Sequence, residues 1–528
     1  MNILFGSVTG TAENVARDAA RKARSRGHHV RICELDEITM DELMEMEDVL
    51  VVIATYGEGE MPFNAEMFWD ELEAIEPPLD TLSYSVLALG DTAYKQFCQA
   101  GKDLDARFEE LGATRRLERV DCDLNYERDA AAWIDKVIPQ IEGAAPVEEP
   151  DDEGALGSVG RRYTRATPFS AEILENRLLS GDGSSKETRH YRISLEGSGL
   201  EYLPGDCVGV VPVNPPEMVA DLLERLRASA EDTVEGYDLS LGQLLSTKFE
   251  INTAGDTLIR AVNSVIEDDD LAQACAGGRA GIEDYAWGRD VVDILSIDPR
   301  LEVDPETLLS LLPPLQHRTY SIASSAKASP GEMHLTVATL RWEREGRAHR
   351  GLCSTHLADT LGQGGRAEIF MVPNSRFRLP NLGSAQVIMV GPGTGIAPYL
   401  GFLQERQASG ASGTNWLITG DRHSATDHVY ARELAAFQEA GVLNRLDLAF
   451  SRDQAEKRYV QDVMRENGEE LYGALERGAY FYLCGDAKRM AVDVEACLVE
   501  LIDTYGTAKP ENFLSDMRRE GRYAKDVY

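Results

Sequence analysis

The sequence has few cysteines, and no two of them have the spacing of metal ligands. Eight cysteines are scattered over 528 residues, and none forms a CxxC pair. A disulfide framework, a zinc site and an iron–sulfur site are therefore all unexpected, and we predict no metal. The simplest interpretation is a set of reduced thiols, most of them buried.

Long apolar runs are also missing. No run approaches the ~20 residues that a helix needs to cross a bilayer. The first ten residues, MNILFGSVTG, contain neither the basic start nor the apolar stretch of a signal peptide. We therefore expect a cytoplasmic protein that does not act at a membrane.

Cations are scarce relative to anions. The chain has 53 lysines and arginines against 90 aspartates and glutamates, a formal net charge of −37. This imbalance argues against nucleic acid or an anionic membrane as a partner. Two explanations stay open: a solvated acidic shell, as in a salty habitat, or an acidic docking face for a more basic protein. Residues 1–143 are acid-rich, which is compatible with both.

The chain is too long for one ordinary core, so we expect roughly three domains. Residues 1–143 alternate apolar strands with amphipathic helices, beginning with a strand at Asn2–Phe5 and a helix at Ala12–Arg26. This alternation predicts a parallel sheet covered on both faces. Residues 144–165 are rich in glycine, proline, alanine and acids, and we interpret them as a flexible linker.

The remaining residues predict two further domains. Residues 166–380 are β-like but contain a helical pattern at about 215–312, which indicates a barrel interrupted by a helical insert. From 381 to 528 the pattern alternates between strands and helices again. The predicted fold class is thus a multidomain α/β protein.

The first loop follows the first strand and precedes the first helix. Hydroxyls and backbone N–H groups at a helix N-terminus can hold a terminal phosphate without any arginine. The alternative is a simple helix cap at Thr11. The loop comprises Ser7, Val8, Thr9, Gly10, Thr11 and Ala12.

Two more loops lie at the same predicted sheet edge. Each brings a tyrosine beside glycines that let the backbone approach a flat ligand. A lone loop tyrosine is usually surface packing, but three such loops together favour a ligand site. The residues are Ala54, Thr55, Tyr56 and Gly57 in one loop, and Leu89, Gly90, Asp91, Tyr94, Phe97 and Cys98 in the other.

The second half contains its own phosphate-binding candidates. A guanidinium on a strand suits a diphosphate because it can donate a bidentate pair of hydrogen bonds. Arg318 is followed by Thr319, Tyr320 and Ser321, although an ordinary surface arginine is the alternative. A second candidate loop precedes a predicted helix, whose N-terminal N–H groups could bind phosphate. It comprises Gly351, Leu352, Cys353 and Ser354.

The C-terminal part contains a glycine-rich loop and, after it, a cationic stretch that favours a phosphorylated nicotinamide nucleotide. The string GPGTGIAP, residues 391–398, follows an apolar strand and differs from the GxGxxG fingerprint. Further along, hydroxyl and cationic groups gather as a 2′-phosphate would require, so NADPH is favoured over NADH. A solvated helix start is the alternative. These residues are Ser451, Arg452, Lys457, Tyr459 and Gln461.

The chain resembles the diflavin reductases over essentially its whole length. The most specific strings are GPGTGIAP, SRDQAEKRYVQD, YLCGDAKRMAVDVE and the ending RYAKDVY. Within the family it is most similar to the flavoprotein (alpha) subunits of bacterial NADPH–sulfite reductase. Two features depart from that branch: the chain starts almost directly at the first strand, where the branch carries an extension, and Tyr56 stands where glutamine is frequent.

The resemblance implies a fold and a set of cofactor contacts. The fold is a flavodoxin-like FMN domain joined to a ferredoxin–NADP-reductase-like module. The first loop would hold the FMN phosphate, and Tyr56 and Tyr94 would flank the isoalloxazine ring. Arg318 would meet the FAD pyrophosphate and Tyr320 would pack on the flavin. The resemblance adds FAD contacts at Thr336, Val337, Ala338 and Trp342, and NADPH contacts at Gly393, Thr394 and Asp493.

The resemblance also implies the reaction. Ser321, Cys484, Asp526 and Tyr528 would surround the site of hydride transfer, with Tyr528 stacked over the FAD ring. Electrons would pass from NADPH to FAD, then to FMN, then to the sirohaem and iron–sulfur subunit of sulfite reductase. A haem-thiolate monooxygenase or a nitrate reductase stays open as the acceptor. A non-catalytic flavin-binding sensor is the alternative of another class.

Overall fold

The computed structural model divides the chain into two compact units, Met1–Ala155 and Leu156–Tyr528, and each is described by itself. Five candidate residues, namely Val8, Thr9, Gly10, Gly57 and Tyr94, lie outside the described residues, as does most of the predicted linker. The structure also does not describe the side chains at positions 127, 279 and 280. The structure describes residues 1–7, 11–56, 59–62, 64–76, 78–92, 96–123, 126–141, 163–165, 167–374 and 376–528.

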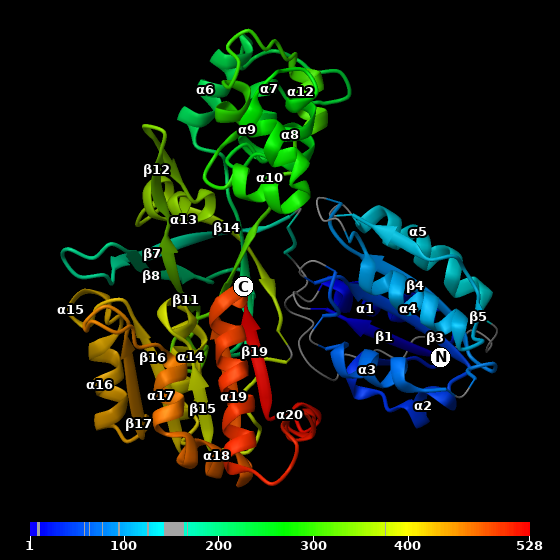
Figure 1. Cartoon of the computed structure of the whole chain (residues 1–528), viewed down its shortest axis with the longest axis vertical. Coiled ribbons are helices and arrows are strands. Elements are labelled where there is room, and N and C mark those ends of the chain that lie inside the picture. The colour runs from blue at the N-terminus through cyan, green and yellow to red at the C-terminus, as the bar shows by residue number, and fades with distance from the viewer. Residues whose placement is uncertain are drawn as a thin grey trace. The chain divides into compact units, whose positions relative to one another are not determined.

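A parallel sheet forms the centre of the first unit (Figure 1). Its strand order is β2-β1-β3-β4-β5, with β6 also paired to β4, and every pairing is parallel. The carboxyl ends of β1, β3 and β4 therefore meet at one edge, where open α/β sheets bind ligands. The strands are β1 (Asn2–Gly6), β2 (Arg31–Glu34), β3 (Asp48–Ala54), β4 (Ser83–Leu89), β5 (Thr114–Arg115) and β6 (Val120–Cys122).

Helices cover both faces of this sheet. Val51 and Val52 point to opposite faces because strand side chains alternate, and each belongs to a different core. One core contains α2, α3 and α4, and the other contains α1 and α5. The helices are α1 (Thr11–Arg24), α2 (Met40–Met44), α3 (Glu66–Ala74), α4 (Gln99–Glu110) and α5 (Glu127–Val137). The predicted doubly wound fold is confirmed.

The second unit begins with a six-stranded antiparallel sheet of order β10-β9-β14-β7-β8-β11. A bridge between Ile322, just after β10, and Leu335 in β11 brings the two ends of the order together. A separate hairpin, β12–β13, leads into the short helix α13. The strands are β7 (Phe169–Leu178), β8 (Glu187–Ser194), β9 (Cys207–Val211), β10 (Arg318–Ser321), β11 (Glu332–Thr339), β12 (Arg341–Arg344), β13 (Arg347–Arg350) and β14 (Arg366–Val372), and α13 is Leu352–Thr355.

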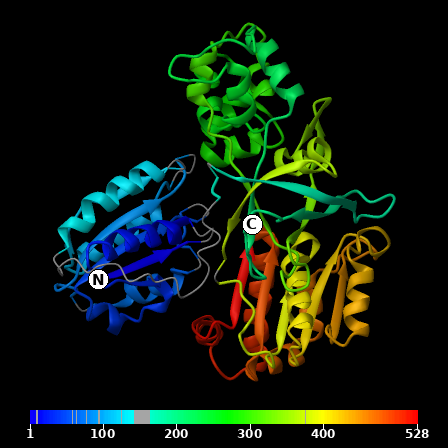
Figure 2. The ribbon, with the colours of Figure 1, turned by 180° about the vertical axis from the view of Figure 1, so that it is seen from behind.

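A block of short helices is inserted between β9 and β10, within the stretch that the sequence predicts as helical. The block has a leucine-rich core of its own, which includes Leu222, Leu244, Leu258 and Ile294. Figure 2 shows it apart from the parallel sheet of the same unit. The helices are α6 (Pro216–Leu226), α7 (Leu241–Thr247), α8 (Asp256–Asn263), α9 (Asp269–Ala276), α10 (Gly278–Ala286), α11 (Val291–Leu295) and α12 (Pro305–Leu311).

A five-stranded parallel sheet of order β17-β16-β15-β18-β19 ends the chain. The edge strand β19 was not predicted, because RYAKDVY has no apolar run and its pairing partner β18 is distant in sequence. The strands are β15 (Val387–Val390), β16 (Asn415–Asp421), β17 (Arg445–Phe450), β18 (Tyr480–Gly485) and β19 (Tyr523–Val527).

Helices pack against this last sheet on both sides. They are α14 (Ala397–Ala408), α15 (Ser424–Asp427), α16 (Ala431–Glu439), α17 (Val460–Glu466), α18 (Gly468–Glu476), α19 (Val492–Tyr505) and α20 (Pro510–Arg519). Nowhere in the described ranges does a helix combine the length and apolarity required to cross a bilayer.

Candidate functional site

Three of the predicted catalytic residues meet around one carboxylate. Ser321 Oγ donates a hydrogen bond to Asp526 Oδ2 over 2.6 Å, and Cys484 Sγ lies 3.8 Å from the same oxygen. The β18–β19 register places Cys484 directly opposite Asp526. The barrel thus supplies Ser321, while the parallel sheet supplies the other two residues.

Burial controls the ionisation of this cluster. It raises the pKa of Asp526 above the usual aspartate range, and the bonds from Ser321 and Cys484 partly oppose that rise. Burial raises the pKa of the Cys484 thiol well above its usual value, and the Asp526 charge adds to the effect. Cys484 is therefore a neutral thiol at pH 7, suited to packing and weak donation rather than to nucleophilic attack.

Sequence reasoning missed a fourth member of the cluster, Cys207. Its Sγ lies 4.0 Å from Ser321 Oγ, and the β9–β10 register pairs the two residues. Burial raises its thiol pKa well above the usual value. In the sequence this cysteine opens the apolar string CVGVVPV, so nothing distinguished it from an ordinary core residue.

The terminal tyrosine lies against the loop between β15 and α14. The hydroxyls of Tyr528 and Thr394 are 2.7 Å apart, and Tyr528 is 62% exposed. Gly395 in this loop is obligatory, because an added Cβ would lie 2.2 Å from the carbonyl oxygen of Cys484. Gly393 has a φ of +61°, which favours glycine. The loop can thus approach the Cys484–Asp526 cluster closely.

The predicted 2′-phosphate residues gather at the carboxyl ends of β16 and β17. The Ser451 backbone N–H donates to the Asp421 carbonyl over 2.9 Å, which fixes the start of the stretch. Arg452 and Lys457 are exposed, and neither forms an ion pair within the described part of the chain. Two cations are therefore available for an anionic ligand.

The same stretch continues into helix α17. Tyr459 is 44% exposed, and Gln461 Nε2 donates to Asp493 Oδ2 over 3.2 Å. Gln461 and Asp493 were predicted independently, and the structure brings them together although they are 32 residues apart in sequence.

The barrel carries the predicted FAD residues. The Arg318 side chain is 49% exposed, with its Nη2 3.8 Å from Glu250 Oε2, so it can turn toward a diphosphate. Burial raises the pKa of Tyr320 well above its usual value. Thr319 lies opposite Gly209 of β9. Ser354 Oγ donates to the Gly351 carbonyl over 3.0 Å, which fixes the second loop, with Leu352 and Cys353 buried beneath it.

The other predicted FAD residues lie on β11 and on the β12–β13 hairpin. Thr336 and Val337 are buried, and the Thr336 and Tyr430 hydroxyls are 2.7 Å apart. Ala338 is half-buried on the same strand. Trp342 is half-buried and donates from Nε1 to the carbonyl of Gly288 in the helical insert, over 3.2 Å. The insert therefore takes part in holding this residue.

In the first unit, the loops converge as predicted. Thr55 N donates to the Leu89 carbonyl over 2.9 Å, and Thr55 Oγ1 accepts from Ala100 N at the start of α4. Ala54 and Leu89 end the adjacent strands β3 and β4 in register. The Tyr56 backbone pairs with Glu60.

The described residues of the first loop fit a phosphate cradle. Ser7 Oγ accepts from Ala12 N over 3.2 Å, and helix α1 begins at Thr11. Asn64, which sequence reasoning missed, accepts from Ser7 N at its Oδ1 over 2.6 Å. Within the described part of the chain, the buried Nδ2 of Asn64 has no hydrogen-bond partner. An unsatisfied buried donor beside this loop is what an anionic ligand would satisfy.

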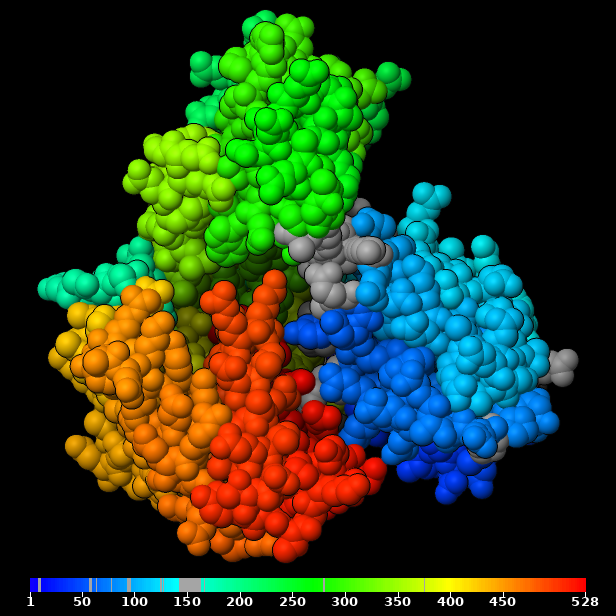
Figure 3. Space-filling view, in the orientation of Figure 1, coloured from blue at the N-terminus to red at the C-terminus, as the bar shows by residue number. Residues whose placement is uncertain are grey.

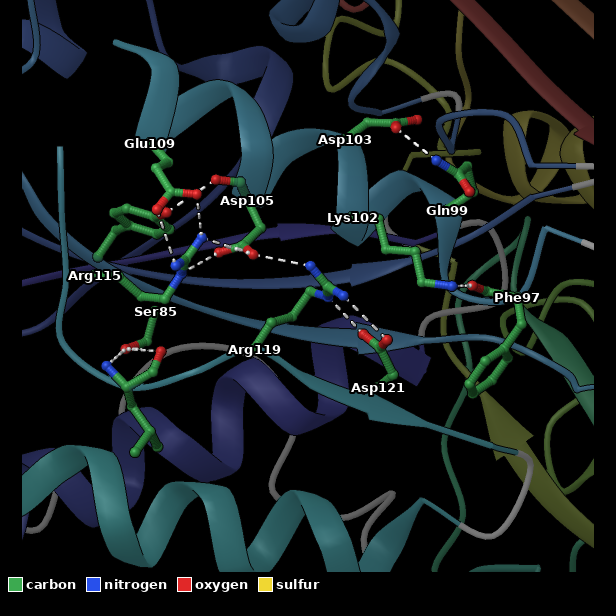
Figure 4. A network of polar contacts seen from close by, with 12 residues as sticks. Ser85, Phe97, Gln99, Lys102, Asp103, Asp105, Glu109, Arg115, Arg119 and Asp121 are labelled. Carbon is green, nitrogen blue, oxygen red and sulfur yellow. Dashed lines mark hydrogen bonds and ion pairs between the residues drawn. The ribbon is translucent and has the colours of Figure 1, made fainter. Parts of the chain in front are cut away.

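An ion-pair network supports the third loop (Figure 4). Arg119 joins Asp105 of α4 to Asp121 of β6, with N–O distances of 2.8 Å and 2.6 Å. Lys102 Nζ also donates to the Phe97 carbonyl over 2.5 Å. Helix α4, which follows the predicted residues Phe97 and Cys98, is thereby tied to β6.

The close packing at Gly90 and the left-handed backbone of Cys98 set the shape of this loop. A Cβ at Gly90 would lie 2.8 Å from the Cys98 backbone nitrogen, so only glycine fits there. Cys98 itself has a φ of +55° and a buried side chain. Asp91 follows Gly90, and the next residue, Thr92, donates to Asp123 from both N and Oγ1.

Three protein families match successive parts of the chain. The Flavodoxin family matches residues 3–133. The FAD binding domain family matches residues 161–261 and 270–356, on either side of part of the helical insert. The Oxidoreductase NAD-binding domain family matches residues 389–496. The order agrees with the succession of the two parallel sheets and the barrel.

The chain is also similar to known proteins over its whole length. The chain is 39% identical over 538 residues to the Sulfite reductase (NADPH) flavoprotein alpha-component of Bacillus subtilis, covering 100% of this chain and 89% of the relative. The protein of that name from Klebsiella pneumoniae is 39% identical, with 100% and 90% covered. The one from Escherichia coli O1:K1 is 38% identical, with 100% and 90% covered.

Proposed function

The chain belongs to the family of the sulfite reductase (NADPH) flavoprotein alpha-components, and on that premise we propose that it passes electrons from NADPH through two flavins to a separate haemoprotein. The observation that carries the proposal is the Ser321–Asp526–Cys484 cluster beneath Tyr528 and the Thr394 loop. This cluster joins the barrel to the nucleotide sheet, where a flavin and a nicotinamide must meet.

The residues of the two candidate sites are suited to bind FMN and FAD. Asn64 Nδ2, which has no partner among the described residues, and the Ser7 loop suit the FMN phosphate, and the half-exposed Arg318 suits the FAD diphosphate. When bound, FAD supplies hydride acceptance and FMN supplies one-electron transfer. The chain's own residues bind, orient and shield these groups.

Tyr528 controls access to the site of hydride transfer. The residue is 62% exposed, and Thr394 is the one partner of its hydroxyl among the described residues, so the ring can move aside when a nicotinamide enters. Asp526 then provides a negative charge where positive charge develops on the nicotinamide ring. Ser321 fixes the carboxylate orientation through its 2.6 Å hydrogen bond.

An anaerobic NADPH titration of the purified chain tests the proposal. Visible absorbance should show that two equivalents of NADPH are needed to bleach all the flavin, because two flavins each accept two electrons. Flavin analysis should find FMN and FAD in equal amounts. Complete bleaching by one equivalent, or no bleaching, would contradict the two-flavin path.

The raised pKa of Asp526 predicts an acid limb in the rate of flavin reduction. As pH falls through this pKa, the carboxylate becomes protonated and loses the charge that stabilises the nicotinamide cation. The rate should therefore fall with decreasing pH, starting at a higher pH than the ordinary aspartate pKa of about 3.9 would give. Stopped-flow absorbance at a series of pH values measures this limb. A rate that is flat down to pH 4, in a chain that keeps its flavins, would contradict it.

For the electron acceptor, we propose the sirohaem and iron–sulfur subunit of sulfite reductase. The names of the relatives support this choice. A haem-thiolate monooxygenase or a nitrate reductase remains the alternative acceptor. Sulfide formation from sulfite, on mixing the chain with such a subunit and NADPH, tests the choice, and reduction of the other acceptors alone would contradict it. The cytoplasmic location stays a prediction.

A further inference from the structure

The hairpin β12–β13 places an aromatic residue beside the helical insert. Trp342 of β12 donates from Nε1 to the Gly288 carbonyl over 3.2 Å. Gly288 has a φ of +77°, and an added Cβ would lie 2.9 Å from that nitrogen. The turn of the insert is therefore shaped to accept the indole edge.

The face of Trp342 packs on a second residue of the hairpin. His349 of β13 lies directly opposite Trp342, with the two ring planes 12° apart and the centroids 5.8 Å apart. The His349 side chain is only 4% exposed, whereas Trp342 is half-buried. One side of the indole thus rests on a buried ring while the residue keeps an accessible surface.

The buried histidine is enclosed by residues of the insert. Asp290 and Asp293 at the start of α11 have carboxylate oxygens 3.7 Å and 3.5 Å from the two ring nitrogens. These two aspartates also cap α11, since each accepts the other's backbone N–H. The ring therefore lies against a rigid helix start rather than a mobile loop.

Arg347 forms ion pairs with both carboxylates. Its Nη1 and Nη2 donate to Asp290 over 3.1 Å and 3.0 Å, and Nη1 also contacts Asp293. Asp290, Asp293 and His349 have the spacing of a metal-ligand group, but the guanidinium already supplies the positive charge there. The ion pairs of Arg347 with both aspartates make the cluster a structural clamp around the His349 ring. In the space-filling view the hairpin and the insert form one continuous surface (Figure 3).

We propose that His349 is a positioning residue for FAD: it supports the indole of Trp342 so that the opposite face can stack on the adenine ring. This inference rests on the proposed FAD role of Trp342. The loop Gly351–Ser354 begins two residues after His349, so the same clamp also sets the start of the diphosphate loop. The helical insert would thereby stabilise bound FAD without touching the flavin ring.

Two substitutions at His349 separate ring stacking from simple filling of space. His349→Leu fills the volume without a flat ring, and FAD should bind about 3- to 10-fold more weakly to the full-length chain. His349→Phe keeps a flat ring, so the affinity should stay within about 2-fold of the wild type. FAD released on ultrafiltration at a series of protein concentrations measures the affinity, and FMN content serves as the internal reference.

A double-mutant cycle tests whether His349 acts through Trp342. Trp342→Ala should weaken FAD binding, and adding His349→Leu to it should weaken binding no further. Glu345→Gln removes the ion pairs of Glu345 with Arg289 of the insert and Arg344 of the hairpin, but it leaves the Trp342–His349 ring stack in place and should leave FAD affinity unchanged. Equal affinities for the Leu and Phe variants, or additive losses in the cycle, would overturn the inference. Normal FAD binding by Trp342→Ala would instead refute the proposed role of Trp342 itself.

Discussion

Replacing Asp526 with asparagine is expected to slow NADPH-dependent flavin reduction by about 100-fold or more, within the range that a positioned charged group contributes. The substitution keeps the shape of the side chain and a group able to bond Ser321 Oγ, which lies 2.6 Å away. It removes the negative charge that favours the nicotinamide cation. The acid limb of the pH profile should disappear with it, because no carboxyl group remains to titrate.

Stopped-flow absorbance under anaerobic conditions measures this effect directly. Lys525→Gln is the matched control, because Lys525 lies on the same strand but its Nζ is 3.4 Å from Glu495, away from the cluster. That variant should reduce its flavins at close to the wild-type rate. Both variants should keep FAD, since neither residue lies in a loop predicted to bind phosphate. An Asp526→Asn chain that reduces its flavin as fast as the wild type would refute the role of the charge.

Replacing Arg452 with alanine is expected to raise the KM for NADPH about 10- to 100-fold. A charge-assisted hydrogen bond to a phosphate contributes about 1.5–3 kcal/mol, and each 1.4 kcal/mol is a factor of ten. Arg452 is exposed and forms no ion pair within the described residues, so its charge is available for the 2′-phosphate. The KM for NADH should not rise, because NADH has no phosphate at that position. Steady-state kinetics with both nucleotides measure the change in preference.

Arg458 supplies the control for this prediction. It lies six residues further along, but its guanidinium binds Glu466 and the carbonyl of Leu448. Arg458→Ala should therefore change the KM for NADPH by much less than Arg452→Ala. If the two variants had the same effect, or if Arg452→Ala weakened NADH equally, the assignment of Arg452 to the 2′-phosphate would be wrong.

Much of the candidate site was accessible from local sequence. The string GPGTGIAP predicts a close-packed loop after a strand, and the structure explains why: a Cβ at Gly395 would collide with the Cys484 carbonyl. The helical block at about 215–312 was also predicted, because leucines recur there with helical spacing. The loop and the helical block are both set by residues close together in the chain, so short sequence patterns predict them.

Other residues escaped prediction because their roles depend on distant partners. Cys207 lies beside the Ser321–Asp526–Cys484 cluster only because β9 pairs with β10, more than a hundred residues later. Asn64 matters through a hydrogen bond to Ser7, 57 residues away. No periodicity or motif around either residue distinguishes it from packing.

The sequence by itself determined the succession of folds, and its resemblance to the diflavin reductases indicated two flavins and NADPH, while the binding roles of the individual loops stay predictions. Only the tertiary structure decided which distant side chains meet. Ser321 is hydrogen-bonded to Asp526, Gln461 is hydrogen-bonded to Asp493, and the Trp342 ring stacks on His349. The physical reason is that loops and helix starts are set by interactions over a few residues. Strand pairing and ring stacking join positions whose separation along the chain carries no periodic signal.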